Sequence, residues 1–409
     1  MITQVSCRTV VTDTRKRTAG YAVLVVAAGL NLRHPITSVA STLDAVTRHY
    51  GLGPPGVAVL SGLPVAMLAA GAALAPALER WWGVERTLLG LAALLTLSVA
   101  LRPASLTALF VGTVVAGLAM SGLSVLVPQM IREHLGGRIG WWSGVFSTSF
   151  GVSAAVGAGL TIPLVHATGS LSLALALWAL PACALMAMAA SVVIGGTPHR
   201  RAASAPAPSC ARPTLLLGQV TAFFGAQAFV FFAVTGWLTS IYVDRGVPPM
   251  QAASLLALAS IAGLPGSLGV SVVAARVRRQ HWIIVAVSTG TVIGLVGVVW
   301  APAVLAPLFV VTLGFCQGAT FGLAMALIVL KADPSRPVAP FSAFAQGVGF
   351  ALAALGPVVL GLVRWAGLSW AYAGSILIAV VVCQAIAGWT AGRSVVPTTS
   401  LPQPMEQPS

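Results

Sequence analysis

Gly20-Tyr-Ala-Val-Leu-Val-Val-Ala-Ala-Gly-Leu-Asn-Leu-Arg-His-Pro-Ile-Thr-Ser-Val-Ala40 is apolar enough to cross a membrane, yet it carries Asn31, Arg33 and His34 well inside the run. In a continuous helix from residue 19, a rise of ~1.5 Å per residue places Arg33 roughly 20 Å along, past the midplane of a ~30 Å hydrocarbon core. A guanidinium stays charged there, at a cost of ~2.5 kcal/mol or more. Such a residue normally faces a bundle interior or a watery cavity, so Arg33 indicates a transport pathway.

An alternative is that Arg33 reaches the outer interface and only anchors the helix. Two features favour the pathway. The helix is expected to continue through Thr37 and Thr42 before its first acid, Asp44. Asn31, Arg33 and Thr37 also place polar groups at nearly the same depth, as a lined cavity would.

The composition indicates a polytopic helical membrane protein. The chain is 57% hydrophobic and only 7% charged, whereas soluble domains average about 25% charged residues. The formal charge of +14 could suggest a nucleic-acid partner. The basic residues, however, lie in short loops between apolar runs and form no single patch, so the expected surroundings are a lipid bilayer and no nucleic acid is expected.

Twelve apolar runs are long enough to span a membrane. They cover residues 19–43, 55–78, 86–103, 104–131, 139–166, 170–195, 214–243, 250–275, 281–301, 303–330, 338–365 and 369–391. The chain is therefore expected to divide into a short tail (1–18), a six-helix bundle (19–195), a flexible linker (196–213), a second six-helix bundle (214–393) and a disordered, Pro-rich tail (394–409).

The distribution of Lys and Arg predicts the orientation. With the N-terminus inside, the inner segments hold Arg8, Arg15, Lys16, Arg17, Arg80, Arg86, Arg132, Arg138, Arg200, Arg201, Arg212, Arg276, Arg278, Arg279, Lys331, Arg336 and Arg393. The outer loops hold only Arg48, Arg102, Arg245 and Arg364. This asymmetry predicts that both termini are cytoplasmic and supports an even number of spans.

The two halves of the sequence are similar to each other. Gly62-Leu-Pro64 in the second span matches Gly263-Leu-Pro265 in the eighth, and Asn31 and Gln227 fall at nearly corresponding places. A repeat at this spacing indicates a duplicated six-helix unit of the same topology. Glycines in the fifth and eleventh spans, such as Gly151 and Gly347, are interpreted as close-packing surfaces where the halves slide.

The acidic residues lie at the helix ends or in the tails. None of the eight falls at mid-membrane, so the carboxylate relay of many proton-coupled carriers is missing. His34 could titrate, but the neighbouring Arg33 disfavours its protonated form.

The other polar groups in the spans are amides and hydroxyls, notably Gln227, Gln317, Gln346 and Ser124. Each Gln can equally be a helix–helix contact, worth roughly 0.6 kcal/mol, or part of a site. One cation with neutral donors suits a small anion or a small, electron-rich polar solute.

No enzyme or cofactor signature occurs. The sequence lacks a phosphate-binding loop that ends in Lys-Ser/Thr. Neither the five scattered cysteines nor the histidines and carboxylates have metal-ligand spacing. We therefore expect no catalytic activity, no cofactor and no metal.

Several motifs resemble the cyanate/nitroimidazole porter family of the major facilitator superfamily. They are Gly29-Leu-Asn-Leu-Arg33 with Thr37-Ser38, Gly62-Leu-Pro64, Gly314-Phe-Cys-Gln-Gly318, and Ala345-Gln-Gly-Val-Gly-Phe350 with Leu355-Gly-Pro357. The resemblance covers residues 20–393. It implies an all-α membrane protein with twelve transmembrane helices in two pseudo-symmetric six-helix bundles, alternating access, a bacterial inner membrane, and cyanate-like or nitroimidazole-like solutes. The chain departs from the family at Ser124, where members often have Asn.

The hypothesis from the sequence is a secondary or facilitative transporter of a small polar or anionic solute that functions as a monomer. The expected solute contacts are Asn31, Arg33, Thr37, Ser124, Gln227, Gln317 and Gln346. A multidrug efflux carrier is the alternative, and a buried acid would favour it. A membrane sensor or scaffold is less favoured because no loop is long enough for a soluble domain.

Overall fold

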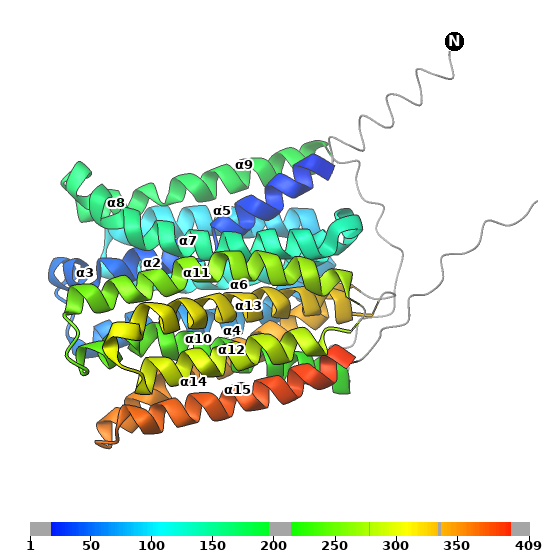
Figure 1. Cartoon of the computed structure of the whole chain (residues 1–409). Coiled ribbons are helices and arrows are strands. Elements are labelled where there is room, and N and C mark those ends of the chain that lie inside the picture. The colour runs from blue at the N-terminus through cyan, green and yellow to red at the C-terminus, as the bar shows by residue number, and fades with distance from the viewer. Residues whose placement is uncertain (1–17, 196–213, 278, 334–336, 394–409) are drawn as a thin grey trace, which may run out of the picture.

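The structure is a computed structural model that describes residues 18–195, 214–277, 279–333 and 337–393. The predicted tails and linker therefore lie mostly outside the described residues. Within those ranges, twelve helices are long and apolar enough to cross a membrane, and they run side by side along a common direction (Figure 1). The bounds of the predicted spans agree with these helices to within a few residues, but the first span is interrupted.

The N-terminal half contains six membrane spans. In chain order its elements are a helix over residues 18–30, α2 (His34–Ser41), α3 (Leu43–Tyr50), α4 (Pro54–Trp82), α5 (Val84–Leu101), η1 (Arg102–Ala104), α6 (Leu106–His134), η2 (Gly136–Arg138), α7 (Ile139–Thr168), α8 (Leu171–Leu177) and α9 (Ala179–Gly195).

The C-terminal half repeats this plan with more regular helices. Its elements are α10 (Leu215–Val243), α11 (Pro249–Arg276), α12 (His281–Trp300), η3 (Ala303–Leu305), α13 (Ala306–Lys331), α14 (Val338–Trp365) and α15 (Trp370–Arg393).

Equivalent helices pack in equivalent pairs, as a duplicated six-helix unit requires. In the first half α4 packs on α6, α2 on α7, and α5 on α9; in the second half α11 packs on α13, α10 on α14, and α12 on α15. The halves meet where α4 lies against α14 and α7 against α11. The fold is thus the predicted pair of pseudo-symmetric six-helix bundles.

Glycines allow the closest helix contacts. A Cβ atom on Gly318 of α13 would lie 2.0 Å from the carbonyl oxygen of Gly263 on α11, so only glycine permits this crossing. Glycines of the fifth and eleventh spans do lie where the halves meet: Gly151 of α7 faces Leu264 of α11, and Gly347 of α14 faces Ala72 of α4. Gly140 and Gly144 of α7 also face α11.

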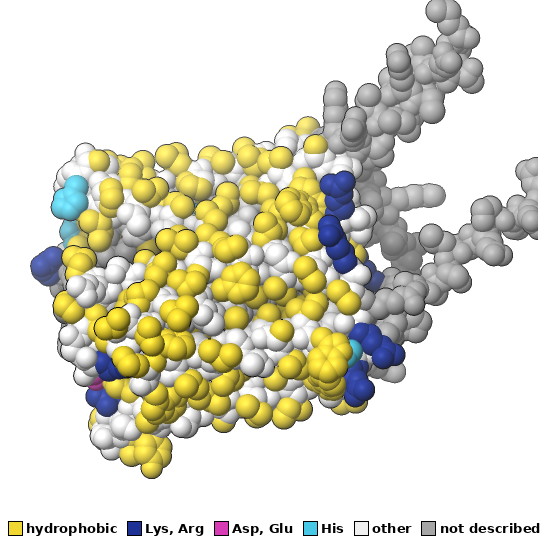
Figure 2. All heavy atoms as spheres, viewed as in Figure 1, with side chains coloured by type: hydrophobic (Ala, Val, Ile, Leu, Met, Phe, Trp, Pro, Cys, Tyr) yellow, Lys and Arg dark blue, Asp and Glu magenta, His cyan; other side chains and the backbone are white. Residues whose placement is uncertain are grey.

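Charged side chains gather at the two ends of the bundle, and a hydrophobic belt separates them (Figure 2). We call one end the basic end. It carries the helix termini with Arg80, Arg86, Arg132, Arg138, Arg276, Arg279 and Arg393. The belt matches a protein surrounded by lipid.

The first span differs from the prediction of one continuous helix. Residues 31–33 are not helical, the helix starts again as α2 at His34, and it is interrupted once more at Thr42. Pro35, in the first turn of α2, has no N–H and suits a helix start better than a helix interior. The expectation of a helix running through Thr42 is therefore wrong.

Arg102 lies between the third and fourth spans, as the sequence predicts, in the short helix η1. Only 1% of it is exposed, and this burial is not predicted by the sequence.

Candidate functional site

The break in the first span is held by the neighbouring α7. Ser153 accepts hydrogen bonds from the backbone N–H groups of Arg33 (3.1 Å) and His34 (2.9 Å). These donors lie at the start of α2, where a helix has no internal acceptors for them. One hydroxyl therefore caps the interrupted helix and fixes the backbone from which the Arg33 side chain projects.

Asn31 also stabilises the break in the first span. Its amide nitrogen donates to the carbonyl oxygens of Ala27 (2.8 Å) and Pro181 (3.1 Å), and its oxygen accepts from Nε2 of His34 (3.0 Å). His34 also stacks on Trp178, with ring centroids 4.9 Å apart. Each polar atom of the Asn31 side chain has a protein partner, so in this conformation Asn31 shapes the chain around Arg33.

Arg33 lies between the two halves and is surrounded by aromatic rings. Its guanidinium carbon is 4.8 Å from the ring centroid of Phe150 on α7, 5.0 Å from that of Phe232 and 5.7 Å from that of Phe231, both on α10. Cation–π contacts of this kind contribute about 0.5–2 kcal/mol each. They are weaker than an ion pair in an apolar interior, and among the described side chains no carboxylate pairs with Arg33. Its positive charge is therefore not neutralised by the described residues.

Gln227 of α10 and Gln317 of α13 face each other in the C-terminal half. Nε2 of Gln227 lies 3.4 Å from Oε1 of Gln317. Both side chains are buried, at 1% and 5% exposure, yet Oε1 of Gln227 and Nε2 of Gln317 have no partner. Buried polar atoms are normally hydrogen-bonded. This pair therefore presents one unused acceptor and one unused donor.

The amide pair and the arginine cage are connected through the helices. Phe231 and Phe321 follow Gln227 and Gln317 by four residues, which is one turn on the same helix face. Phe321 packs against Phe150, with centroids 5.4 Å apart. The cation, its aromatic cage and the two amides thus form one central cluster from α7, α10, α13 and the break in the first span.

Ser124 and Gln346 form a separate contact across the halves. The Ser124 hydroxyl donates to Oε1 of Gln346 (2.9 Å), while Nε2 of Gln346 donates to the Ser124 carbonyl (3.1 Å) and to the Ser342 hydroxyl (2.8 Å). Both side chains are about 1% exposed. The bonding capacity of the Gln346 amide is largely used, so the geometry favours helix contact over solute contact at these two residues.

Thr37 is one turn beyond Arg33 on α2. Its hydroxyl donates to the Arg33 carbonyl (3.2 Å) and lies against Gly157 of α7, where an added Cβ would come within 2.3 Å of it. Thr37 therefore packs α2 onto α7 within the N-terminal half.

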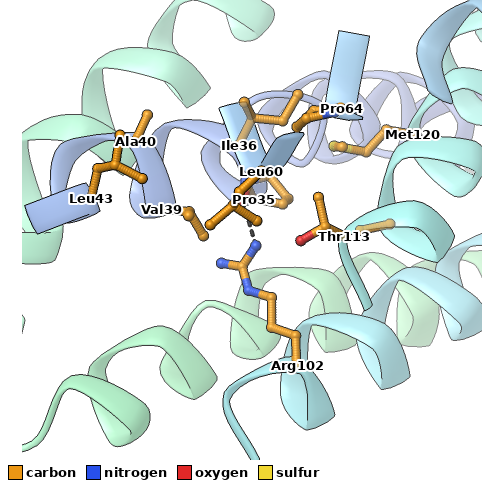
Figure 3. A pocket seen from close by; sticks show the side chains of 11 residues that line it. Pro35, Ile36, Val39, Ala40, Leu43, Leu60, Pro64, Arg102, Thr113 and Met120 are labelled. Carbon is orange, nitrogen blue, oxygen red and sulfur yellow. Dashed lines mark hydrogen bonds between the residues drawn. The ribbon is translucent and has the colours of Figure 1, made fainter. Parts of the chain in front are cut away.

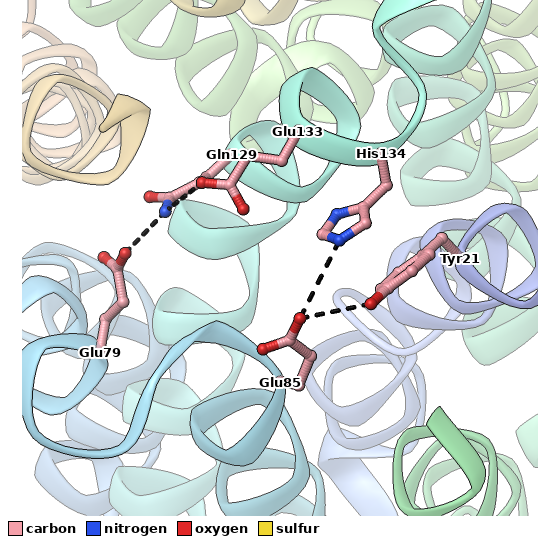
Figure 4. A network of polar contacts seen from close by, with 6 residues as sticks. All are labelled: Tyr21, Glu79, Glu85, Gln129, Glu133 and His134. Carbon is pink, nitrogen blue, oxygen red and sulfur yellow. Dashed lines mark hydrogen bonds and ion pairs between the residues drawn. The ribbon is translucent and has the colours of Figure 1, made fainter. Parts of the chain in front are cut away.

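The glutamates of the N-terminal half form polar contacts at the basic end (Figure 4). Nε2 of Gln129 donates to Glu79 (2.6 Å) and Glu133 (2.8 Å). Glu85 accepts from the Tyr21 phenol (3.3 Å) and lies 4.0 Å from Nε2 of His134. These glutamates lie at helix ends, as predicted, away from the central cluster.

Hydrogen bonds also join the halves on the basic side of Arg33. Arg132 of α6 donates to the carbonyl of Asp333 (2.8 Å), and the N–H of Ala339 donates to Gln129 (3.0 Å). Deeper in the bundle, Ser267 of α11 donates to Ser147 of α7 (2.7 Å). Together with the Ser124–Gln346 contact, these bonds hold the halves together between the central cluster and the basic end.

The sequence interpretation missed the aromatic part of the cluster, which consists of Phe150, Phe231, Phe232 and Phe321. A signal for part of it was present: each of the three Gln residues is followed by Phe four positions later. Phe150 had no comparable signal, because its contact with Arg33 depends on the packing of α7 beside the helix break.

Within the described residues, twelve spanning helices form two equivalent halves, with a cation between them that no described carboxylate neutralises. These features define the class of two-bundle membrane transporters. The sequence matches the profile of the Major Facilitator Superfamily over residues 22–357, and the chain belongs to that superfamily. It is a multi-pass membrane protein that transports small solutes.

Relatives extend over most of the chain. It is 30% identical to an uncharacterized transporter, YycB, of Bacillus subtilis (90% of this chain, 92% of the relative). It is 29% identical to the 2-nitroimidazole transporter of Escherichia coli (88% and 92%) and 26% identical to the cyanate transport protein CynX of Escherichia coli (83% and 89%). These relatives confirm the resemblance to the cyanate/nitroimidazole porter family.

Solved structures confirm the fold. The proton:xylose symporter XylE superposes with a TM-score of 0.68 at 12% identity, covering 93% of this chain and 98% of its own. FucP, in the outward conformation, also gives 0.68, at 13% identity, with coverage of 92% and 100%.

Proposed function

We propose that this protein carries a small, planar, electron-rich solute across the bacterial plasma membrane, and that the solute binds between Arg33, Gln227 and Gln317. The observation that carries the proposal is the Arg33 guanidinium, which lies between the halves among three aromatic rings and has no carboxylate partner among the described side chains. A solute with negative charge or electron density supplies the missing partner.

The amide pair narrows the solute class. Gln227 offers an unused acceptor and Gln317 an unused donor, so a solute with a neighbouring N–H and acceptor atom would use both. The rings beside Arg33 also favour a flat ring system. A nitroimidazole-like heteroaromatic compound has all three features, whereas cyanate offers acceptors only. One relative is named a 2-nitroimidazole transporter, which also supports a nitroimidazole-like solute over cyanate.

The remaining predicted contacts receive positioning roles in this proposal. Asn31 and Thr37 fix the helix break and α2, so that Arg33 projects between the halves. Ser124 and Gln346 join the halves in the state described here. They contact solute only if their present bonds exchange during transport.

We further propose that the basic end faces the cytoplasm, with both termini there, because Lys and Arg concentrate on that side. The bonds that join the halves on the basic side of Arg33 then correspond to closure toward the cytoplasm. Rocking of the halves would open the central cluster to either side in turn. The protein would act as a monomeric carrier, with no catalytic step.

Efflux of lipophilic cations is the alternative within transport. A carrier of that kind would be expected to place a carboxylate in its pathway. The glutamates of the described N-terminal half lie at the basic end, and the central cluster instead holds a cation. The charge at the centre therefore favours the anionic or electron-rich class.

Uptake of labelled 2-nitroimidazole and labelled cyanate into liposomes that contain the purified protein tests the proposal. Wild type is compared with Arg33→Gln and with the matched control Arg48→Gln, whose side chain is exposed at the end opposite the basic end. Each is measured with and without a pH gradient. We expect transport by wild type and by the control, and a loss of at least ~tenfold in Arg33→Gln, since a charge-assisted hydrogen bond contributes ~1.5–3 kcal/mol.

Gln227→Leu separates the two solutes. This substitution removes the free acceptor and is expected to impair uptake of the nitroimidazole more than uptake of cyanate. Unchanged transport in correctly folded Arg33→Gln would contradict the role of the cation. Transport of an organic cation in place of both compounds would favour the alternative.

A further inference from the structure

Arg102 is a second buried cation in the N-terminal half, outside the central cluster. It is 1% exposed. Nη1 donates to the carbonyl of Pro35, and Nη2 donates to the hydroxyl of Ser38 (2.8 Å). The guanidinium is therefore hydrogen-bonded to the first turns of α2. Its Nε has no hydrogen-bond partner. A buried guanidinium donor without an acceptor is costly, so this atom needs an explanation.

Close packing fixes the position of Arg102. A Cβ atom on Gly112 of α6 would lie 2.6 Å from the Cβ of Arg102, so glycine lets η1 approach α6. The Tyr50 phenol donates to the carbonyl of Pro103 (2.8 Å) and ties down the same turn. The arginine is therefore held in place and cannot extend to the surface without disturbing this end of the half.

The charge of Arg102 has no counter-charge among the described side chains. No carboxylate among them pairs with it. Its titratable neighbours are Tyr50 and His34, and neither is a carboxylate. Burial raises the pKa of the Tyr50 phenol, so Tyr50 stays neutral. The partners of the guanidinium are one carbonyl and one hydroxyl, which solvate the cation but do not neutralise it.

A cavity of about 80 Å³ lies directly beside this guanidinium (Figure 3). Its walls come from α2, α3, α4 and α6, and apart from Arg102 and Thr113 they are apolar; they include Pro35, Val39, Leu60, Ala116 and Met120. The Thr113 hydroxyl donates to the Leu109 carbonyl (2.6 Å). Arg102 is therefore the one lining side chain with a hydrogen-bond donor to spare.

We propose that this cavity binds a small monovalent anion against Arg102. A fixed cation with an unused N–H, an apolar wall and room for only a few atoms together select charge and small size. A halide or a small linear anion meets both conditions, whereas a sugar or a phosphorylated metabolite does not fit. The anion would neutralise the buried charge and thereby stabilise the start of α2, which directly follows the break at Arg33.

The test is the thermal stability of the full-length protein in detergent, in sodium bromide against sodium gluconate at equal ionic strength. Gluconate is the large-anion control. The variants are Ala116→Leu, which fills the cavity and keeps Arg102, and Arg102→Met, which removes the donors. Ala100→Leu makes the same change as the first variant on an exposed face of α5. Arg33→Gln removes the cation of the central cluster.

Bromide should raise the melting temperature of wild type, Ala100→Leu and Arg33→Gln along a saturating curve. Ala116→Leu should need at least ~tenfold more bromide for the same shift, since a charge-assisted hydrogen bond is lost. Arg102→Met, where it folds, should show no saturable shift. Electron density for bromide beside Nε of Arg102, located by anomalous diffraction, would give the position directly.

A second series with cyanate in the Arg33→Gln background identifies the source of the anion. If cyanate stabilises this variant as bromide does, the cavity takes the solute class itself; if only halides do, it takes an inorganic ion. Equal bromide curves for Ala116→Leu and wild type would overturn the proposal, as would loss of the bromide effect in Arg33→Gln. No bromide effect in wild type would mean that water alone fills the cavity.

Discussion

The Ser124–Gln346 contact should set the balance between the two states of the transporter. It contains two hydrogen bonds between the halves, from the Ser124 hydroxyl to Oε1 of Gln346 and from Nε2 back to the Ser124 carbonyl. Both lie on the basic side of Arg33, so they are made in the state that is closed at that end. Gln346→Met keeps a long, unbranched side chain and removes both bonds.

The size of the effect follows from the number of bonds. Hydrogen bonds between membrane helices average ~0.6 kcal/mol, and those in soluble proteins ~1 kcal/mol. Two bonds therefore amount to ~1.2–2 kcal/mol, which changes the ratio of the two states about 8- to 30-fold. Ser124→Ala removes only the hydroxyl bond and should change the ratio about 3- to 5-fold. Ser342→Ala is the matched control, because its bond to Gln346 lies within α14.

The populations can be measured by electron–electron spin distances across the basic end. Spin labels at Arg86→Cys on α5 and Arg393→Cys on α15 report on exposed positions in opposite halves, after the five native cysteines have been replaced. We expect the fraction of molecules with the longer distance to be smallest in wild type and Ser342→Ala, larger in Ser124→Ala and largest in Gln346→Met. A distribution unchanged by Gln346→Met, or a larger effect from Ser342→Ala than from Ser124→Ala, would refute this reasoning.

Three further predictions concern the site and its support. Arg33→Lys keeps the charge but loses the planar, stacking guanidinium, so the KM for a planar solute should rise about tenfold in liposome uptake; an unchanged KM would mean that charge alone matters. Gly318→Ala should lower stability by ~1–3 kcal/mol, because its Cβ meets the Gly263 backbone. Gly159→Ala, into open space, is its control, and equal melting temperatures would contradict the packing argument. Ser153→Ala leaves the N–H groups that start α2 without their acceptor and should cost ~1–3 kcal/mol. Ser153→Thr should restore the melting temperature if the hydroxyl is what matters.

The sequence predicts the fold well because membrane burial leaves a strong pattern. Each span is a long apolar run between charged or Gly/Pro segments, and the bilayer allows little besides helices there. The internal similarity of Gly62-Leu-Pro64 and Gly263-Leu-Pro265 also indicated the duplication, which appears in the structure as equivalent helix pairs. The break at residues 31–33 was not predicted, since apolar helices in membranes often tolerate proline and the break depends on a partner in α7.

The candidate site was predicted in part. Arg33, Gln227 and Gln317 were identified because polar groups are rare in the spans, and the structure brings each of them to the region between α10, α13 and the first span. Their aromatic neighbours were missed because apolar residues carry no signal in an apolar chain. The burial of Arg102 could not be predicted for a different reason: a basic residue at the end of an apolar run has the same pattern whether it faces water or turns back into the fold.

The rings around Arg33 belong to two bodies that move against each other. Phe150 lies in the first half, and Phe231 and Phe232 lie in the second. Without a solute, the guanidinium links the two halves electrostatically, because aromatic ring faces from both halves stabilise its charge. In the proposed function, a bound anion would compete for the same guanidinium and weaken this link. Solute binding would then be coupled to the freedom of the halves to separate, and a loaded carrier would move more readily than an empty one.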